Sequence, residues 1–164
     1  MQCAVNILNS IGAIGYISEN SDPNRVLSEC QKKDIPILAI RAVQAGALTS
    51  SMDRKPHASG MDRADFIDFE KALPFRKLAN EWGESPASLA HRFSLSVKKV
   101  SSVVLGVKNR KELQECIDAE ETDDVPAISS TLGLKSNVTV RGNSPEGLGA
   151  SGSTFVAVYV GISS

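Results

Sequence analysis

Three short apolar runs along the chain have the length and composition of buried β-strands. They are Cys3–Leu8, Ile35–Ile40 and Val100–Leu105, and each is bounded by polar or turn-forming residues. Between and after them, apolar residues recur at the i, i+3, i+4 spacing of one helix face. The pattern predicts the order strand, helix, strand, two helices, strand, helix, with the strands paired in parallel through right-handed crossovers.

Residue types that favour helix ends mark the first two helical stretches. Asp22 followed by Pro23 predicts a helix that runs to about Lys33. A second stretch begins at about Asp62 and is interrupted by Pro74, because proline lacks the amide hydrogen that a helix interior needs. The helix faces predicted to be buried consist of Val26, Leu27 and Cys30, of Phe75, Leu78, Ala79 and Trp82, of Leu89, Ala90 and Phe93, and of Leu113, Cys116 and Ile117.

Further helix ends are predicted in the second half of the chain. Gly83 ends one helix, and Ser85 with Pro86 begins the next. Asn109, with Glu112 three residues later, forms an approximate capping box in which asparagine takes the place of serine or threonine. These elements predict an α/β fold, and the uniformly apolar strands fit an open doubly wound sheet as well as a closed barrel.

Composition agrees with one ordinary domain and disfavours two classes of partner. The chain has 164 residues, of which 41% are hydrophobic, with 18 Lys and Arg against 19 Asp and Glu. A net charge of −1 supplies no field that would attract nucleic acid or an anionic membrane. Since we find neither a signal peptide nor the roughly 18 consecutive apolar residues of a membrane span, we expect a cytoplasmic protein.

The last part of the chain differs from the rest. Residues 122–164 hold five charged residues but six of the 12 glycines, so we divide the chain into a domain at 1–121 and a low-charge Gly/Ser-rich tail at 122–164. The tail is expected either to be partly disordered or to form a strand at Asn137–Arg141 or Phe155–Val160. Gly147–Gly152 matches the dinucleotide motif G-x-G-x-x-G, but it lacks the strand, the helix and the acidic residue that this motif requires, so we interpret it as a linker.

The cysteines and histidines do not have the spacing of a metal site. Cys3, Cys30 and Cys116 form no C-x-x-C pair and are expected to be small buried residues. His57 and His91 lie 34 residues apart, without a second ligand near either. We expect a loop position for His57 and a helix-surface or half-buried position for His91, and no metal site.

Two places favour an anion. The segment from Gly106 through Lys108 to Asn109 joins a strand to a helix, where unpaired amides and the helix dipole attract negative charge. Arg41 follows the second strand, and the small residues Ala45–Ala47 would allow a ligand to approach the backbone. The alternatives are an ordinary turn with a solvated lysine and a surface arginine.

Four segments, in order along the chain, resemble the C-terminal part of an aldo-keto reductase. Gln2–Asn9 is similar to the sixth-strand pattern Q-x-x-Y-N-L-L-N, and Ala39–Leu48 to the seventh-strand segment. Ser85–Phe93 resembles the helix that follows, and Val103–Leu113 the eighth-strand cofactor loop. The resemblance covers residues 2–120 and implies a partial TIM (β/α)8 barrel, made of strands six to eight and their helices, to which the Gly/Ser-rich tail is attached.

The resemblance also implies NADP(H) as the cofactor and a small aldehyde or ketone as the substrate. The implied cofactor-binding residues are Gln2 at the nicotinamide carboxamide, Arg41, Val43, Ala45 and Gly46 along the pyrophosphate, Gly106 and Lys108 at the adenosine phosphate, and Glu112 and Glu115 at the adenosine end. The chain departs from the family pattern at Ile40, where an aromatic residue is common, and at Ala42, Glu112 and Cys116, where proline, glutamine and asparagine are common.

The family's catalytic Asp, Tyr, Lys and His lie on strands that precede the matched segments. We therefore assign no catalytic residue and expect no reductase turnover from this chain, because hydride transfer to a carbonyl needs a proton donor beside the cofactor. The alternative function is a non-catalytic α/β interaction or oligomerisation module. Open sheet edges would favour self-association in either case.

Overall fold

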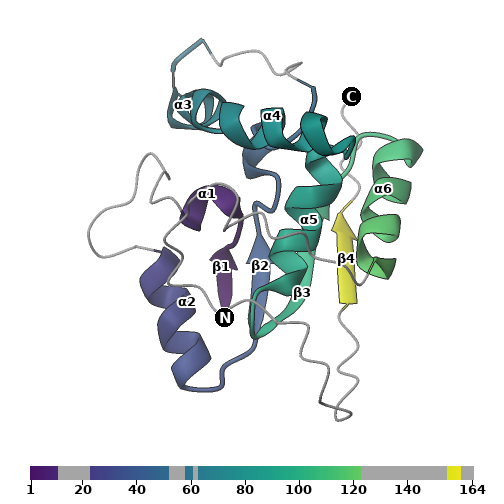
Figure 1. Cartoon of the computed structure of the whole chain (residues 1–164). Helices are drawn as coiled ribbons and strands as arrows, with labels where there is room; N and C mark the ends of the chain where they lie inside the picture. The colour runs from purple at the N-terminus through teal and green to yellow at the C-terminus, as the bar shows by residue number, and fades with distance from the viewer. Residues whose placement is uncertain (11–22, 52–57, 61–62, 123–154, 160–164) are drawn as a thin grey trace.

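A parallel sheet of four strands forms the centre of the protein (Figure 1). The computed structural model describes residues 1–10, 23–51, 58–60, 63–122 and 155–159. The strands lie in sequence order, as β1 (Gln2–Ala4), β2 (Ile37–Ile40), β3 (Val100–Gly106) and β4 (Phe155–Tyr159). The predicted parallel pairing is confirmed, and the strand at residues 155–159 adds a neighbour to β3.

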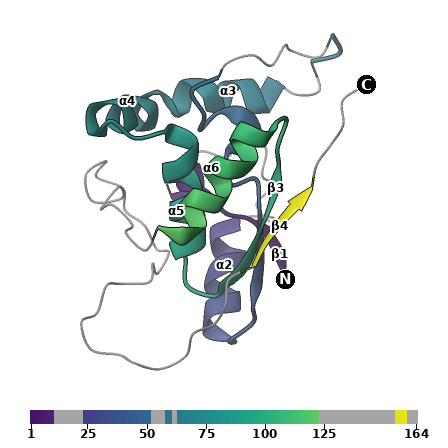
Figure 2. The same cartoon turned by 90° about the vertical axis from the view of Figure 1, so that its right-hand side faces the viewer.

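The helices cover one face and one end of this sheet. They are α1 (Ile7–Ser10), α2 (Pro23–Lys32), a 3-10 turn η1 (Gln44–Gly46), α3 (Arg63–Lys71), α4 (Leu73–Trp82), α5 (Pro86–Ser96) and α6 (Arg110–Glu121). Figure 2 shows α2, α5 and α6 on one side of the strands, while α3 and α4 lie across the end to which the strands point. In contact with the sheet, α2 touches β1, α5 touches β3, and α6 touches β4.

Burial alternates along the strands, as a sheet covered on one face requires. The buried positions of the first three strands are Cys3, Ile37, Ala39, Val100, Val103 and Leu105. The positions between them are half-buried or exposed, among them Leu38, Ile40 and Val104. A register shift after Ile37 leaves Ser101 as an extra exposed residue of β3, so that the buried residues of both strands stay on the helix side.

The strand predicted at Cys3–Leu8 is only partly correct. Strand β1 ends at Ala4, and the chain turns into α1 at Ile7. Asn6 causes the turn, because its side-chain Oδ1 accepts a hydrogen bond from the backbone N–H of Leu8 at 3.0 Å. The apolar residues after Asn6 are buried as expected, but they are buried on a helical turn.

The remaining element boundaries lie close to the predictions. Strand β2 begins at Ile37, after the proline at position 36, and helix α2 spans Pro23–Lys32, with Asp22 outside the described residues. The helical stretch that Pro74 interrupts breaks at Ala72, and the proline lies in the first turn of α4. The predicted ends Gly83, Ser85 and Asn109 are all confirmed as caps, with φ of 69° at Gly83.

Most of the predicted core positions are buried, and the three cysteines are free and buried. Trp82 and Ile117 are exceptions, because their side chains are 37% and 38% exposed at the outer edges of α4 and α6. The expectation for His91 was also wrong. Its side chain is only 5% exposed and packs between α5 and α6, where Nε2 lies 3.3 Å from the Cys116 Sγ.

Burial keeps both members of this pair uncharged. It lowers the pKa of His91 to about 4, and it raises the pKa of Cys116 to about 11, with Glu115 and Glu112 adding to the effect. The His91 Nδ1 has no hydrogen-bond partner among the described residues. The imidazole is therefore a neutral core group at neutral pH.

The burial of His91 predicts a loss of stability in mild acid. The unfolded chain binds a proton on this residue below its ordinary pKa of 6.5, and the folded chain only below about 4, so the free energy of unfolding falls as the pH decreases through that window. Between about pH 7 and about pH 5 the loss due to His91 is about 2 kcal/mol. Urea unfolding of the wild-type chain and of His91→Gln at both pH values measures it, and equal losses in the two proteins would contradict the prediction.

Candidate functional site

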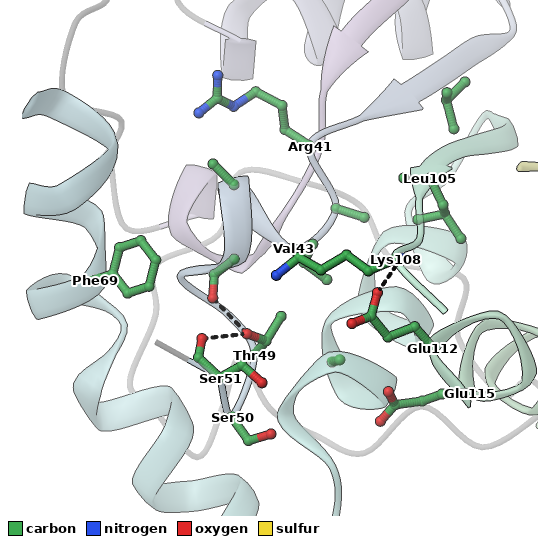
Figure 3. Close-up of a pocket in the computed structure, with 16 residues that line it drawn as sticks. Arg41, Val43, Thr49, Ser50, Ser51, Phe69, Leu105, Lys108, Glu112 and Glu115 are labelled. Carbon is green, nitrogen blue, oxygen red and sulfur yellow. Dashed lines mark hydrogen bonds between the residues drawn. The ribbon is translucent and has the colours of Figure 1, made fainter. Parts of the chain in front are cut away.

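A pocket of about 570 Å³ lies at the carboxyl ends of β2 and β3 (Figure 3). One wall is the segment from Arg41 to Ser51, and the opposite wall is the end of β3 with the first turns of α6. Phe69 of α3 and Ala87 of α5 complete the lining. In α/β proteins with parallel strands, ligands bind at this end of the sheet.

Eight of the nine predicted cofactor-binding residues line this one pocket. They are Arg41, Val43, Ala45, Gly46, Gly106, Lys108, Glu112 and Glu115. Gln2 is the exception, because it is the first residue of β1 and pairs with Leu38, before the end of β2. Its side chain is exposed and is not part of the pocket lining.

The wall contributed by the second strand is a turn with left-handed backbone conformations. Arg41, Gln44 and Ala45 have φ values of 58°, 44° and 52°, and Gly46 has a φ of 95°. Residues other than glycine rarely adopt such backbone angles, so contacts with the surrounding structure must stabilise the turn. Two backbone hydrogen bonds within the turn contribute to this stabilisation. They run from Gln44 N–H to the Arg41 carbonyl at 2.8 Å and from Gly46 N–H to the Val43 carbonyl at 3.0 Å.

A side-chain hydrogen-bond network around the fully buried Gln44 also stabilises the turn. The Gln44 Oε1 accepts hydrogen bonds from Asn6 Nδ2 at 2.9 Å and from Arg41 Nε at 3.2 Å, and Gln44 Nε2 donates to Asp68 Oδ2 at 2.7 Å. Asn6 also donates to the Arg41 carbonyl at 2.9 Å. The network thus joins the end of β1, the turn after β2 and helix α3.

Arg76 of α4 stabilises the same wall at Ala47, after the turn. Its Nη1 donates to the Ala47 carbonyl at 2.7 Å, and its Nη2 donates to the Phe69 carbonyl at 3.0 Å. Sequence reasoning assigned no role to Gln44, Asp68 or Arg76. The sequence signal for this buried network is a single polar residue between apolar neighbours, as Gln44 is between Val43 and Ala45.

The opposite wall contains the predicted capping box in a modified form. The Asn109 Oδ1 accepts from Glu112 N–H at 3.0 Å, as predicted. The Glu112 carboxylate accepts from the backbone N–H of Lys108 at 2.7 Å and from Asn109 Nδ2 at 3.3 Å. Glu115 accepts a hydrogen bond from the hydroxyl of Ser85, the N-cap of α5. Glu112 is therefore part of the cap of α6, and Glu115 bonds to the residue that caps α5.

The pocket lining combines cationic and anionic side chains with hydroxyl groups. The Lys108 side chain extends across the pocket toward the turn after β2, whereas the Arg41 guanidinium points away from Lys108 (Figure 3). The hydroxyl-bearing residues Thr49, Ser50 and Ser51 line the side near the turn. A Cβ built on Gly106 would meet no described heavy atom within 4 Å, so the backbone is open to a ligand there.

The titratable side chains in the described lining of the pocket are Arg41, Lys108, Glu112 and Glu115. The described lining contains no histidine, cysteine or tyrosine.

Within the described ranges, no three His, Cys, Asp or Glu side chains gather as a metal site would require. The helices of these ranges also include none that is long and apolar enough to cross a membrane. His57 and the G-x-G-x-x-G segment lie outside the described residues.

The structure defines an α/β fold with a pocket at the carboxyl ends of its parallel strands. The sequence model of the Aldo/keto reductase family matches residues 2–130, which is most of the chain. The chain therefore belongs to the aldo/keto reductase family. No curated protein and no solved structure matches it.

The buried network predicts a large effect of removing Gln44. In Gln44→Ala, Asn6 and Asp68 lose a buried partner, and we expect the free energy of unfolding to fall by about 2 to 4 kcal/mol. Gln114→Ala is the matched control, because Gln114 is exposed on α6 and bonds only to Asp118 Oδ1. Urea unfolding of both variants measures the difference, and a loss of similar size in the two would show that the network does not stabilise the turn.

Proposed function

We propose that this chain is the cofactor-binding part of an aldo/keto reductase, that its pocket binds NADP(H), and that it does not reduce carbonyl substrates by itself. The observation that carries the proposal is the meeting of eight residues from two distant segments, 41–46 and 106–115, at a single pocket. The family resemblance assigns those residues to the cofactor, although the two segments are about 60 residues apart in the sequence. Bound NADP(H) would supply a hydride for an aldehyde or a ketone.

Each part of the pocket has chemistry that fits a part of the dinucleotide. Arg41 and the turn through Gly46 suit a pyrophosphate, because the guanidinium is cationic and the small residues leave the backbone accessible. Lys108 and the open backbone at Gly106 suit the adenosine phosphate. By the family resemblance, Glu112 and Glu115 would contact the adenosine end. Gln2 lies apart from this pocket, so its proposed contact with the nicotinamide carboxamide rests on the resemblance alone.

The sheet supports an origin in a (β/α)8 barrel. Its strands are parallel and in sequence order, and α2, α5 and α6 cover one face, whereas a doubly wound sheet reverses its strand order and carries helices on both faces. We therefore propose that β1, β2 and β3 correspond to strands six, seven and eight of the family barrel. In a closed barrel the eighth strand pairs with the first. Strand β4 takes that position beside β3.

The proposed absence of turnover follows from the missing proton donor. The tyrosines of the chain are Tyr16 and Tyr159, and neither has the aspartate five residues earlier that the family pattern contains, since Ile11 and Thr154 stand there. Without a general acid beside the cofactor, a carbonyl oxygen cannot receive its proton as the hydride arrives. The chain would then bind the cofactor without using it.

Titration of the chain with NADPH and NADP tests this function, followed by nucleotide fluorescence. We expect saturable binding, and about tenfold weaker binding in Lys108→Ala, because a charge-assisted phosphate contact is worth at least about 1.4 kcal/mol. Lys111→Ala is the control, since Lys111 is exposed on α6 outside the pocket. No NADPH should be consumed on addition of an aldehyde. A folded wild-type chain that binds neither nucleotide would disprove the proposed cofactor binding. Aldehyde-dependent oxidation of NADPH would disprove the proposed lack of turnover.

A second function, self-association, is favoured by the face of the sheet opposite the helices. The side chains of Leu38, Ile40 and Val104 lie on it, are only partly buried, and are not packed against the core cluster. None of the described helices covers this face (Figure 2). Strands β1 and β4 also each have one edge without a described neighbour, and such edges favour pairing with another chain. We propose a second copy of this chain as the occupant.

Sedimentation velocity over a wide range of protein concentration measures this self-association. We expect the wild-type chain to associate, and Leu38→Lys to shift it toward the monomer, because a charge on the apolar face costs desolvation on association. Ile117→Lys serves as the control, since Ile117 is an exposed apolar residue on the helix side. A wild-type monomer at all concentrations, or equal effects of the two substitutions, would argue against this function.

A further inference from the structure

The Glu112 carboxylate occupies the hydrogen-bond donors that an anion in this pocket would use. Its Oε2 accepts from the backbone N–H of Lys108 at 2.7 Å, and its Oε1 accepts from Asn109 Nδ2 at 3.3 Å. Both donors belong to the connection between β3 and α6, next to the Lys108 side chain (Figure 3). A negative group already occupies the position at the start of α6 that the helix dipole makes favourable for anions.

The second carboxylate of the pocket is fixed in a different way. Glu115 accepts a hydrogen bond from the Ser85 hydroxyl at the start of α5, whereas the amide of Lys108 donates to Glu112. Glu112 is therefore the acid that competes directly for the Lys108 amide. The pocket lining contains two cationic residues and two anionic residues, so a phosphate that enters gains no excess of positive charge.

A phosphate and a ribose hydroxyl interact with this carboxylate in opposite ways. A phosphate oxygen that approaches the Lys108 amide must displace Glu112 or remain beside it as a like charge, which disfavours binding. A hydroxyl can donate a hydrogen bond to the carboxylate, as acidic residues of dinucleotide-binding sites do to a ribose. A neutral glutamine at the same position would remove the repulsion and could donate to the phosphate.

We propose that Glu112 is a specificity-determining residue that reduces the preference of this pocket for a phosphorylated over an unphosphorylated adenosine ribose. This inference rests on the proposed function, because it concerns the adenosine end of the same pocket. Glu112 acts as an internal carboxylate that occupies the phosphate-binding amide, and a ligand phosphate must compete with it. Replacing Glu112 by glutamine removes the negative charge, so that a ligand phosphate competes for that amide with a neutral amide oxygen.

The test compares adenosine 2′,5′-bisphosphate with adenosine 5′-monophosphate, two probes that differ by the phosphate on the ribose. Calorimetric titration gives the ratio of their dissociation constants for the wild-type chain, Glu112→Gln and Glu120→Gln. We expect Glu112→Gln to shift the ratio about tenfold toward the bisphosphate, a change of about 1.4 kcal/mol. Glu120→Gln removes the same charge from an exposed site on α6 outside the pocket and should leave the ratio unchanged.

A second measurement uses inorganic phosphate and the backbone amide resonance of Lys108. Phosphate should shift this resonance in Glu112→Gln at a lower concentration than in the wild-type chain. The inference is overturned if the probe ratio changes by less than twofold in Glu112→Gln, if Glu120→Gln changes it equally, or if neither phosphate nor the bisphosphate binds to Glu112→Gln.

These outcomes separate the inference from the proposed function. Binding of NADPH without any effect of Glu112→Gln would retain the function and reject the inference. Phosphate and bisphosphate binding that Glu112→Gln strengthens, together with no binding of NADPH or NADP to any variant, would support the inference and reject the nicotinamide nucleotide as the ligand.

Discussion

The pocket depends on the buried hydrogen bonds of Gln44. This side chain accepts from Asn6 and Arg41 and donates to Asp68, and it is completely buried. Because buried amide groups are costly when unpaired, the three segments that carry these residues must come together for the chain to fold. Their meeting holds the left-handed turn from Arg41 to Gly46, which no local preference of its non-glycine residues would favour. The turn is a wall of the pocket, so core stability and site geometry have the same cause.

Charge is balanced within the pocket, and this distinguishes it from a simple anion site. Lys108 and Arg41 favour a phosphate, whereas Glu112 and Glu115 are both engaged by groups that begin helices. Glu112 takes part in the cap at the start of α6, and Glu115 bonds to Ser85, the residue that caps α5, so both acids have a structural role without a ligand. Ligand preference in this pocket then depends on how far a ligand can replace the hydrogen bonds that the capping acids already receive.

The sheet has helices on one face only, and this arrangement has consequences for the whole molecule. Burial at every second position of β2 and β3 supplies the core, and it leaves Leu38, Ile40 and Val104 on the opposite face. A closed barrel would bury such residues in its interior. In the described part of this chain they lie on a surface, beside strand edges that can pair. The proposed barrel origin and the proposed self-association therefore rest on the same geometry.

Local periodicity and cap chemistry are enough to predict the strands at Ile37–Ile40 and Val100–Gly106 to within two residues, and the caps at Gly83, Ser85 and Asn109. The candidate residues from Arg41 to Glu115 come from the family resemblance. The structure adds that Asn6 ends the first strand, through a local hydrogen bond from the N–H of Leu8. It also shows that His91 is buried against Cys116, that Gln2 lies apart from the pocket, and that β4 pairs with β3, and these three depend on contacts between residues far apart in the chain. Periodicity fits an open sheet and a barrel equally, and the order of the strands, with helices on one face, is a property of the packed structure alone.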